Sequence, residues 1–216
     1  FRRVLFRSIA EKGIWTAKKR YMLNVRMGEE NVYLKKPELK IMGIETARSS
    51  TPEVVREALK NVISTIMNKD ESAVQQFVGE FRNVFNGLKP EKVAFPRSCN
   101  GLREYFDPTN IYKKGTPIAT KGSLIYNHHL RKNKLGGKYQ EIREGDKIKF
   151  IYLKTPNMLG DKVLAFTGKI PDEFGLDGYI DYDLQFEKTF LEPLRTILGV
   201  IGWKDEKVDT LESLFG

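Results

Sequence analysis

Apolar residues recur at the spacing of a helix along two neighbouring stretches of the chain. In the first, SSTPEVVREALKNVISTIMNK, they stand at Val54, Val55, Leu59, Val62, Ile63 and Ile66. Thr51 suits the N-cap of this helix, and Pro52 suits its first position. The second stretch, residues 71–88, repeats the pattern with Val74, Phe77, Val78, Phe81, Val84 and Phe85. The spacing therefore predicts two amphipathic helices that form an antiparallel hairpin.

Other stretches of the chain have strand-like patterns. KRYMLNVR (residues 19–26) and ELKIMGIET (residues 38–46) predict two strands joined by a polar turn. Further strands are predicted in DKIKFIYLK and DKVLAFTG, a short helix within SLIYNHHLRK, and a long helix over residues 177–203. The region from residue 89 to residue 137 is rich in turn signals. Together these elements predict an α+β fold.

Composition excludes several classes of protein. The chain has 216 residues, of which 40% are hydrophobic, but no apolar run approaches the roughly 18 residues that span a bilayer. No membrane partner is therefore expected. The single cysteine, Cys99, excludes an internal disulfide framework and fits a reducing cytosol. One cysteine and two adjacent histidines give no metal-ligand spacing.

Charge is unevenly distributed along the sequence. The formal net charge is +9, of which three positive charges lie in the first eight residues. Residues 92–138 hold ten lysines and arginines against two acids, whereas residues 171–216 hold eleven acids against four bases. A basic run of this kind fits either a solvated face or a binding site for a polyanion.

The first eight residues, FRRVLFRS, differ from everything that follows. Three arginines among four bulky apolar residues fit a basic arm that binds nucleic acid. The codons TTC AGA CGT GTG CTC TTC CGA TCT also translate to these residues, and that string resembles a common short-read sequencing adapter. We therefore expect residues 1–8 to be an artefact, and residues 9–216 to be a piece of a longer protein.

A basic cluster, Lys18, Lys19, Arg20 and Tyr21, stands at the start of the first predicted strand. Residues two apart on a strand share a face, so Lys19 and Tyr21 would together meet a phosphate backbone or a groove edge. A solvated strand end is the alternative interpretation of these four residues.

Four segments in order, GIWTAKKRYMLNV, LKIMGIETARSSTP, LIYN and DYDLQFEKTFLEPLRTIL, resemble the C-terminal third of a family B DNA polymerase of the tailed-phage (myovirus) replicative type. The resemblance covers nearly all of residues 9–216. It implies the end of the palm at residues 9–48, the thumb at residues 49–203 and a tail at residues 204–216. The implied fold is α+β, with a small antiparallel sheet from the palm and a mainly helical thumb.

The resemblance also implies roles for the KKRY segment and for the junction that follows it. In that family, the residues matching Lys19 and Tyr21 hold the primer strand behind its growing 3′ end. Every Watson–Crick pair presents a minor-groove acceptor at nearly the same place, so Lys19 would sense pair geometry. Arg20 and Tyr21 would position the backbone. Glu45 and Arg48, in the GIETAR segment, are expected to form an ion pair that braces the palm-to-thumb junction.

A thumb grips the duplex by its phosphates, which gives affinity without sequence preference. Candidates for these contacts come from turn and basic positions: Ser98, Asn100, Arg103, Lys114 and Lys121. His128 and His129 are expected on the thumb surface or in helix packing rather than in catalysis.

Asp181 and Asp183 imitate the Asp-x-Asp motif that holds two metals in polymerases. On a helix, residues two apart point in different directions, so these carboxylates cannot converge on one ion. The resemblance therefore places the catalytic aspartates and the two-metal Mg²⁺ site upstream, outside this chain. It likewise places the dNTP substrates in the missing palm and fingers. We expect no cofactor bound by this piece and no activity from it alone.

The C-terminal stretch KVDTLESLFG resembles a tether for a sliding clamp, with Leu211, Leu214 and Phe215 as a small apolar plug. It lacks the leading glutamine and the second terminal aromatic of the usual pattern. A C-terminal helical turn that packs on the thumb is the alternative.

The resemblance implies a DNA-directed DNA polymerase that acts on primer–template DNA in the cytoplasm of an infected bacterium. The rival class is a basic, non-enzymatic module that binds single-stranded nucleic acid or an acidic protein. Single-strand binders need exposed aromatic residues for base stacking. Most aromatic residues outside the KKRY and Tyr112 regions fall on helical core stripes, which favours the polymerase.

Overall fold

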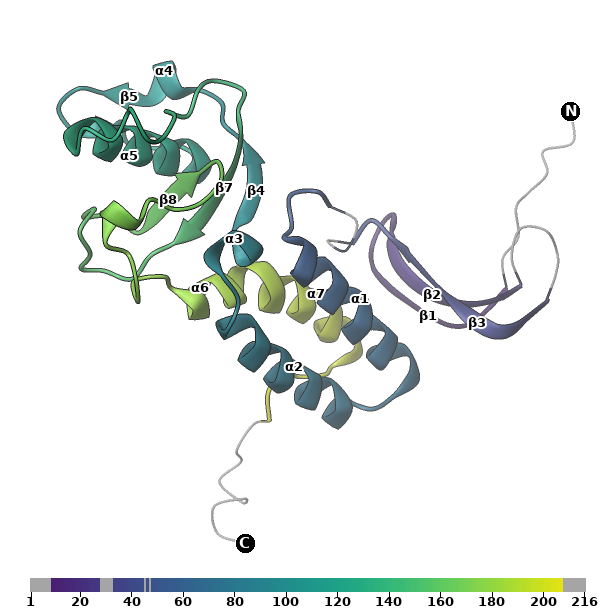
Figure 1. Cartoon of the computed structure of the whole chain (residues 1–216). Coiled ribbons are helices and arrows are strands. Elements are labelled where there is room, and N and C mark those ends of the chain that lie inside the picture. Colours follow the sequence, from purple (N-terminus) through teal and green to yellow (C-terminus); the bar gives the residue numbers. More distant parts are fainter. Residues whose placement is uncertain (1–8, 28–32, 45, 47, 208–216) are drawn as a thin grey trace, which may run out of the picture. The chain divides into compact units, whose positions relative to one another are not determined.

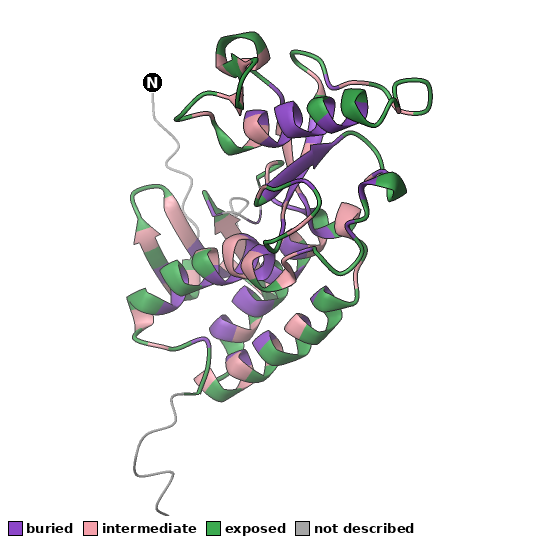
Figure 2. Cartoon of the chain, turned by 90° about the vertical axis from the view of Figure 1, so that its left-hand side faces the viewer, coloured by how far each residue is buried: buried purple, intermediate pink, exposed green. Residues whose placement is uncertain are grey.

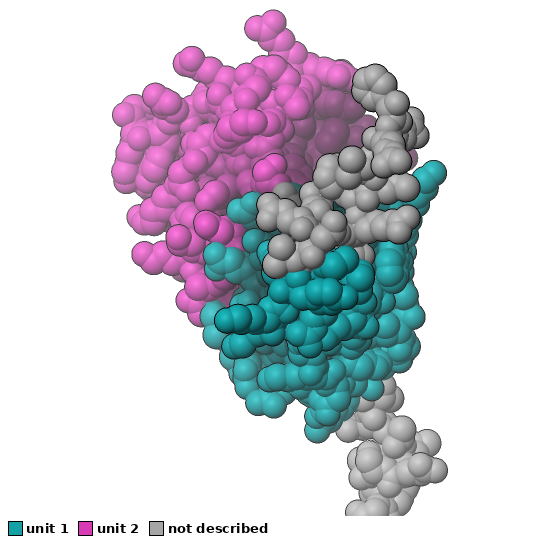
Figure 3. Space-filling view, turned by 90° about the vertical axis from the view of Figure 1, so that its right-hand side faces the viewer, with its two compact units in different colours: residues 1–48, 55–84, 190–216 teal, residues 49–54, 85–189 magenta. Residues whose placement is uncertain are grey.

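The computed structural model of the chain describes residues 9–27, 33–44, 46 and 48–207. Contacts divide the chain into two compact units (Figure 3). Unit 1 combines residues 1–48, 55–84 and 190–216, and unit 2 combines residues 49–54 and 85–189. These units follow packing, whereas the domain boundaries expected after residues 48 and 203 follow chain order and stay a prediction. The suspected artefact, residues 1–8, lies outside the described residues.

Unit 1 contains an antiparallel sheet of β1 (Ile9–Ala17), β2 (Arg20–Met27) and β3 (Tyr33–Met42), in that order (Figure 1). The sequence predicted β2 and the later part of β3 but missed β1. It also placed residues 33–37 in the polar turn, whereas they form the first half of β3, although Pro37 lacks the amide hydrogen that a central strand needs. β3 lies at the edge of the sheet, where proline is tolerated.

The helical hairpin predicted from apolar spacing is confirmed as α1 (Glu53–Asn68) and α2 (Glu71–Asn86). Leu59, Val62 and Ile66 of α1 are completely buried, as their shared stripe predicts. α7 (Glu192–Ile201) completes the helical part of unit 1. The rings of Phe81 and Phe190 meet edge to face, with centroids 4.8 Å apart.

The long helix expected over residues 177–203 is interrupted, which corrects the prediction. It consists of α6 (Tyr182–Phe186), a π-helical turn η3 (Glu187–Leu191) and α7. Pro193 stands in the first turn of α7. Because proline has no amide hydrogen and its ring clashes with the carbonyl four residues earlier, it cannot continue a regular α-helix. The wider π-turn just before it accommodates this break.

Unit 2 is built on a second antiparallel sheet, in the order β4 (Phe95–Ser98), β7 (Lys147–Tyr152) and β8 (Val163–Phe166). α5 (Ile118–Lys132) packs on β8, all four residues of which are buried (Figure 2). The approach is close, because a Cβ at Gly122 would lie 2.7 Å from the backbone nitrogen of Ala165. The sequence predicted β7, β8 and the second half of α5.

Short elements surround this sheet: α3 (Pro90–Val93), α4 (Leu102–Tyr105), the hairpin β5 (Phe106–Asp107) and β6 (Ile111–Tyr112), and the 3-10 turn η2 (Asp172–Phe174). The buried side chain of Gln185 connects α6 to α3 and to β7. Its amide nitrogen donates to the carbonyl of Val93 at 2.7 Å, and its amide oxygen accepts from the backbone of Tyr152 at 3.3 Å. The α+β class is confirmed. None of the helices in the described ranges is long and apolar enough to cross a membrane.

Candidate nucleic-acid interface

The KKRY cluster lies at the turn between β1 and β2 in unit 1. Lys18 and Lys19 form this turn and are exposed, while Arg20 and Tyr21 begin β2. Lys19 has a left-handed backbone, with φ of 64°. Lys19 therefore lies in the turn and not in the strand, so the prediction that Lys19 and Tyr21 share a strand face is corrected.

Tyr21 instead lies on one face of the sheet beside two residues that sequence analysis did not select. It is paired with Trp15 on β1 and with Met42 on β3. The Trp15 and Tyr21 rings lie 6.4 Å apart, and Trp15 and Met42 are 59% and 47% exposed. An aromatic and apolar strip thus runs across three strands next to the basic turn.

The opposite face of the sheet is packed within unit 1. Ile14 and Met22 are buried there, and the Lys12 ammonium donates to the carbonyl of Ile66 at 2.9 Å. The two faces therefore differ in role, with one supporting the fold and the Tyr21 face available to a ligand. Glu45, the expected partner of Arg48, lies outside the described residues.

A second basic site lies entirely within unit 2, between β4, β7 and the turn that precedes α1. This groove has a volume of about 520 Å³. Among the residues that the structure describes, its lining includes three cationic side chains, four hydroxyl groups and no carboxylate: Ser49, Ser50, Pro96, Arg97, Ser98, Lys147, Ile148, Lys149 and Thr167. We call it the basic groove.

Pairing of β4 with β7 positions the polar groups of the basic groove. Ser98 lies opposite Lys147 in the register, and the Lys147 ammonium donates to the Ser98 hydroxyl at 2.9 Å. The Arg97 guanidinium donates to the carbonyl of Ser50 at 2.7 Å, which ties the turn before α1 to the sheet. Lys149 donates to the carbonyl of Glu91 at 2.9 Å. These contacts hold the positive charges on a rigid base.

Of the five thumb residues predicted from turns and charge, only Ser98 lines the basic groove. Asn100 and Lys114 are exposed elsewhere in unit 2, and Arg103 borders a different cavity. Sequence analysis missed Lys147, Lys149 and Thr167 because they lie on β7 and after β8, outside the basic run. The alternation of Lys147 and Lys149 with the apolar residues Ile148 and Phe150 along a strand was the available signal.

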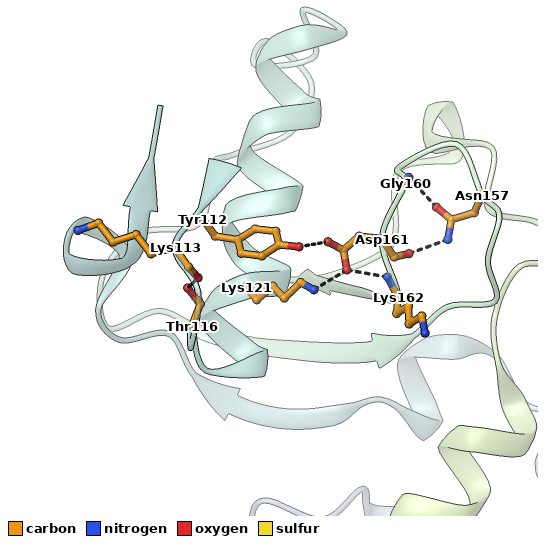
Figure 4. A network of polar contacts seen from close by, with 8 residues as sticks. All are labelled: Tyr112, Lys113, Thr116, Lys121, Asn157, Gly160, Asp161 and Lys162. Atoms are coloured by element: carbon orange, nitrogen blue, oxygen red, sulfur yellow. Dashed lines mark hydrogen bonds and ion pairs between the residues drawn. The ribbon is translucent and has the colours of Figure 1, made fainter. Parts of the chain in front are cut away.

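Lys121 is engaged in a local network (Figure 4). Its ammonium lies 2.8 Å from an oxygen of Asp161 and 4.6 Å from the centre of the Tyr112 ring. The Tyr112 hydroxyl donates to the other oxygen of Asp161 at 2.6 Å. Burial lowers the pKa of Lys121, but the hydrogen bonds with Asp161 and Tyr112 outweigh it and leave the pKa raised. Lys121 thus holds the β5–β6 hairpin against α5, a role that sequence analysis did not anticipate.

The remaining candidates have structural surroundings. Asp181 caps α6 by accepting from the backbone of Leu184 at 3.0 Å, and Asp183 is exposed. Across the described ranges, no three His, Cys, Asp or Glu side chains gather as a metal site would require. His129 is buried in the packing of α5, and His128 is exposed. Leu211, Leu214 and Phe215 lie outside the described residues.

Similarity extends over 94% of the chain to DNA-directed DNA polymerases of Enterobacteria phage T4 and Escherichia phage RB69, each 34% identical. The expected resemblance to phage DNA polymerases is confirmed. The matches span 208 and 207 residues, which is 22% of the length of each relative. No protein-family profile matches the chain.

Proposed function

We propose that this chain forms the end of the palm and the thumb of a DNA-directed DNA polymerase, and that it grips primer–template duplex behind the active site. The observation that carries the proposal is the basic groove, whose described lining presents cations and hydroxyl groups without a carboxylate. Such groups contact phosphate oxygens in any sequence, which suits an enzyme that must move along its template. The similarity to two phage polymerases supports the same function.

The basic turn of unit 1 would contribute a second contact. Lys18 and Lys19 are exposed beside Tyr21, so they fit a duplex whose backbone or minor groove faces the turn. Two separate contacts on one duplex would raise the effective concentration of each site for the DNA.

Nucleotidyl transfer would be performed by parts of the polymerase that this chain does not contain. Two Mg²⁺ ions would there activate the 3′ hydroxyl and stabilise the leaving group. The carboxylates described above do not fit such a pair of ions, so no catalytic step is assigned to this chain. A dNTP would bind in those other parts, a sliding clamp would bind the C-terminal tail, and the enzyme would act in the infected bacterial cell.

Fluorescence anisotropy of the chain with a labelled duplex, across a series of salt concentrations, tests the proposal. Lys147→Gln should weaken binding and reduce the slope of log affinity against log salt by about one, because one phosphate contact is lost. Lys132→Gln is the matched control, since Lys132 is an exposed lysine of unit 2 outside the groove. Equal slopes for Lys147→Gln and the wild type, or no duplex binding by the folded chain, would contradict the proposal.

A further inference from the structure

A cavity of about 660 Å³ lies next to the basic groove in unit 2. Its walls come from α4, the β5–β6 hairpin, α5 and the segment 141–144. This volume lies within the usual range of small-ligand pockets, which are mainly apolar with a few polar groups at their edges. The phosphate contacts proposed above do not involve this cavity.

The walls of the cavity are mainly apolar and include an exposed aromatic ring. Leu124 and Ile142 are buried at its base, and Phe106 on the hairpin is 44% exposed. An exposed phenylalanine in a concave wall offers a face on which a planar group can stack.

Charge on the cavity lining is balanced, unlike that of the basic groove. Three arginines, Arg103, Arg131 and Arg143, stand against three carboxylates. Each carboxylate is engaged by groups of unit 2: Glu141 by Arg131 at 2.6 Å, Glu144 by the backbone of Leu102 at 2.9 Å, and Asp107 by the backbone of Thr109 at 2.8 Å. A balanced lining favours an uncharged occupant over a phosphate. The exposed guanidinium groups of Arg103 and Arg143 and the exposed His128 ring offer hydrogen bonds to such a group.

The hairpin wall is held in a strained conformation. Ile111 has φ of 69°, which is unfavourable for a β-branched residue. The next residue, Tyr112, is tied to Asp161 by its hydroxyl (Figure 4). This tether holds the hairpin, with Phe106 and Ile111, in place beside the cavity.

The cavity and the basic groove follow one another along the same two chain segments. Ser98 and Lys147 line the groove, and Leu102 and Glu144 line the cavity. Backbone hydrogen bonds continue between them, from Cys99 to Asp146 at 2.9 Å and from Gly145 to Cys99 at 2.7 Å. A DNA strand whose phosphates lie in the groove therefore has a pocket for an uncharged, planar, hydrogen-bonding group beside its path.

We infer that this cavity receives a single unpaired base of the DNA strand that the basic groove holds, stacked on Phe106. The inference rests on the proposed function, because the groove supplies the phosphate contacts. The phosphates stay in the groove, where charge is positive, and the neutral base enters the cavity, where charge is balanced.

The test compares two labelled DNAs by anisotropy, a blunt duplex and the same duplex with a single-stranded extension. The wild-type chain should bind the extended DNA about tenfold more tightly, since stacking of one base on an aromatic side chain has about this effect. Phe106→Ala should abolish this preference and leave binding of the blunt duplex unchanged. Phe106→Leu, which keeps most of the apolar volume, should lose most of the preference as well.

Tyr179→Ala is the matched control, because Tyr179 is 37% exposed in unit 2 and does not line the cavity. It should keep the tenfold preference. A 4-thiothymine placed in the extension should cross-link within residues 102–111, 124–131 or 141–144 of the wild-type chain, which line the cavity.

Four outcomes would overturn the inference. Equal affinity of the wild type for both DNAs would leave duplex binding intact and show that the cavity holds no unpaired base. An equal loss on both DNAs from Phe106→Ala would show that Phe106 does not act on the single-stranded extension. Cross-links that map elsewhere would also exclude the cavity. Failure of the folded chain to bind either DNA would overturn the proposed function as well.

Discussion

The backbone of Gly43 lies directly against the carbonyl group of Lys19. A Cβ added at Gly43 would overlap the Lys19 oxygen, and Gly43 has a left-handed backbone with φ of 68°. The segment that follows β3 thus supports the basic turn between β1 and β2. This relationship gives the glycine of the GIETAR segment a physical role.

Gly43→Ala should destabilise unit 1 by more than the roughly 1–2 kcal/mol that a left-handed alanine alone costs, because the new Cβ also displaces the turn. Urea unfolding measures the change. Gly160→Ala is the control, since Gly160 has φ of 70° and no heavy atom within 4 Å of an added Cβ. Equal losses for the two variants would show that Gly43 has no packing role against Lys19.

Asp161→Asn should lower the stability of unit 2 by about 1–3 kcal/mol, because Asp161 accepts from both Tyr112 and Lys121. The Asp161 side chain is only 11% exposed, so solvent screens it little. The exposed pair of Lys169 and Asp172 provides the comparison, and Lys169→Gln should change stability far less than Asp161→Asn, because solvent screens this pair. Chemical denaturation with two-state fitting measures both changes in stability. A loss for Asp161→Asn as small as that for Lys169→Gln would rule out a tether at Asp161.

Gly122→Ala and Gly79→Ala should change stability in opposite directions. A Cβ at Gly122 would press on the backbone of β8, which should cost about 1–3 kcal/mol. A Cβ at Gly79, inside α2, meets nothing within 4 Å, so the higher helix propensity of alanine should stabilise by about 0.5–1 kcal/mol. Thermal melting of both variants measures these changes. A melting midpoint for Gly122→Ala that is no lower than that of the wild type would refute the close packing of α5 on β8.

His129 should titrate below its usual pKa of 6.5. Burial lowers the pKa, the neighbouring His128 and Lys132 add to this effect, and a hydrogen bond with the backbone of Leu159 opposes it. The unfolded ring takes up a proton near pH 6.5 while the folded ring stays neutral, so stability should fall as pH drops below about 6.5. An NMR titration of the ring protons, assigned with His128→Gln, measures the midpoint. A midpoint at or above 6.5 would contradict this prediction.

The sequence by itself determined the elements whose apolar residues repeat with a clear period. Val55, Leu59 and Val62 predicted α1 because a helix that buries one face must repeat near 3.6 residues. The same helical period located α2, and the sequence pattern likewise located β7 and β8 as strands. It missed β1, whose segment IAEKGIWTA mixes charged and apolar residues, and it extended a helix through the π-turn before Pro193.

Tertiary structure alone decided where the candidate site lies. The basic groove gathers Ser50, Ser98, Lys147 and Thr167 from four separate parts of the chain. The last three meet because β4 pairs with β7 and β7 with β8, and the hydrogen bond from Arg97 holds Ser50 beside them. The local sequence pattern also grouped Lys121 with the candidate phosphate-binding residues, whereas in the fold its ammonium group forms an ion pair with Asp161. Periodicity reports which face of an element is buried, but the partner of each face depends on contacts between residues distant in sequence, which no local pattern encodes.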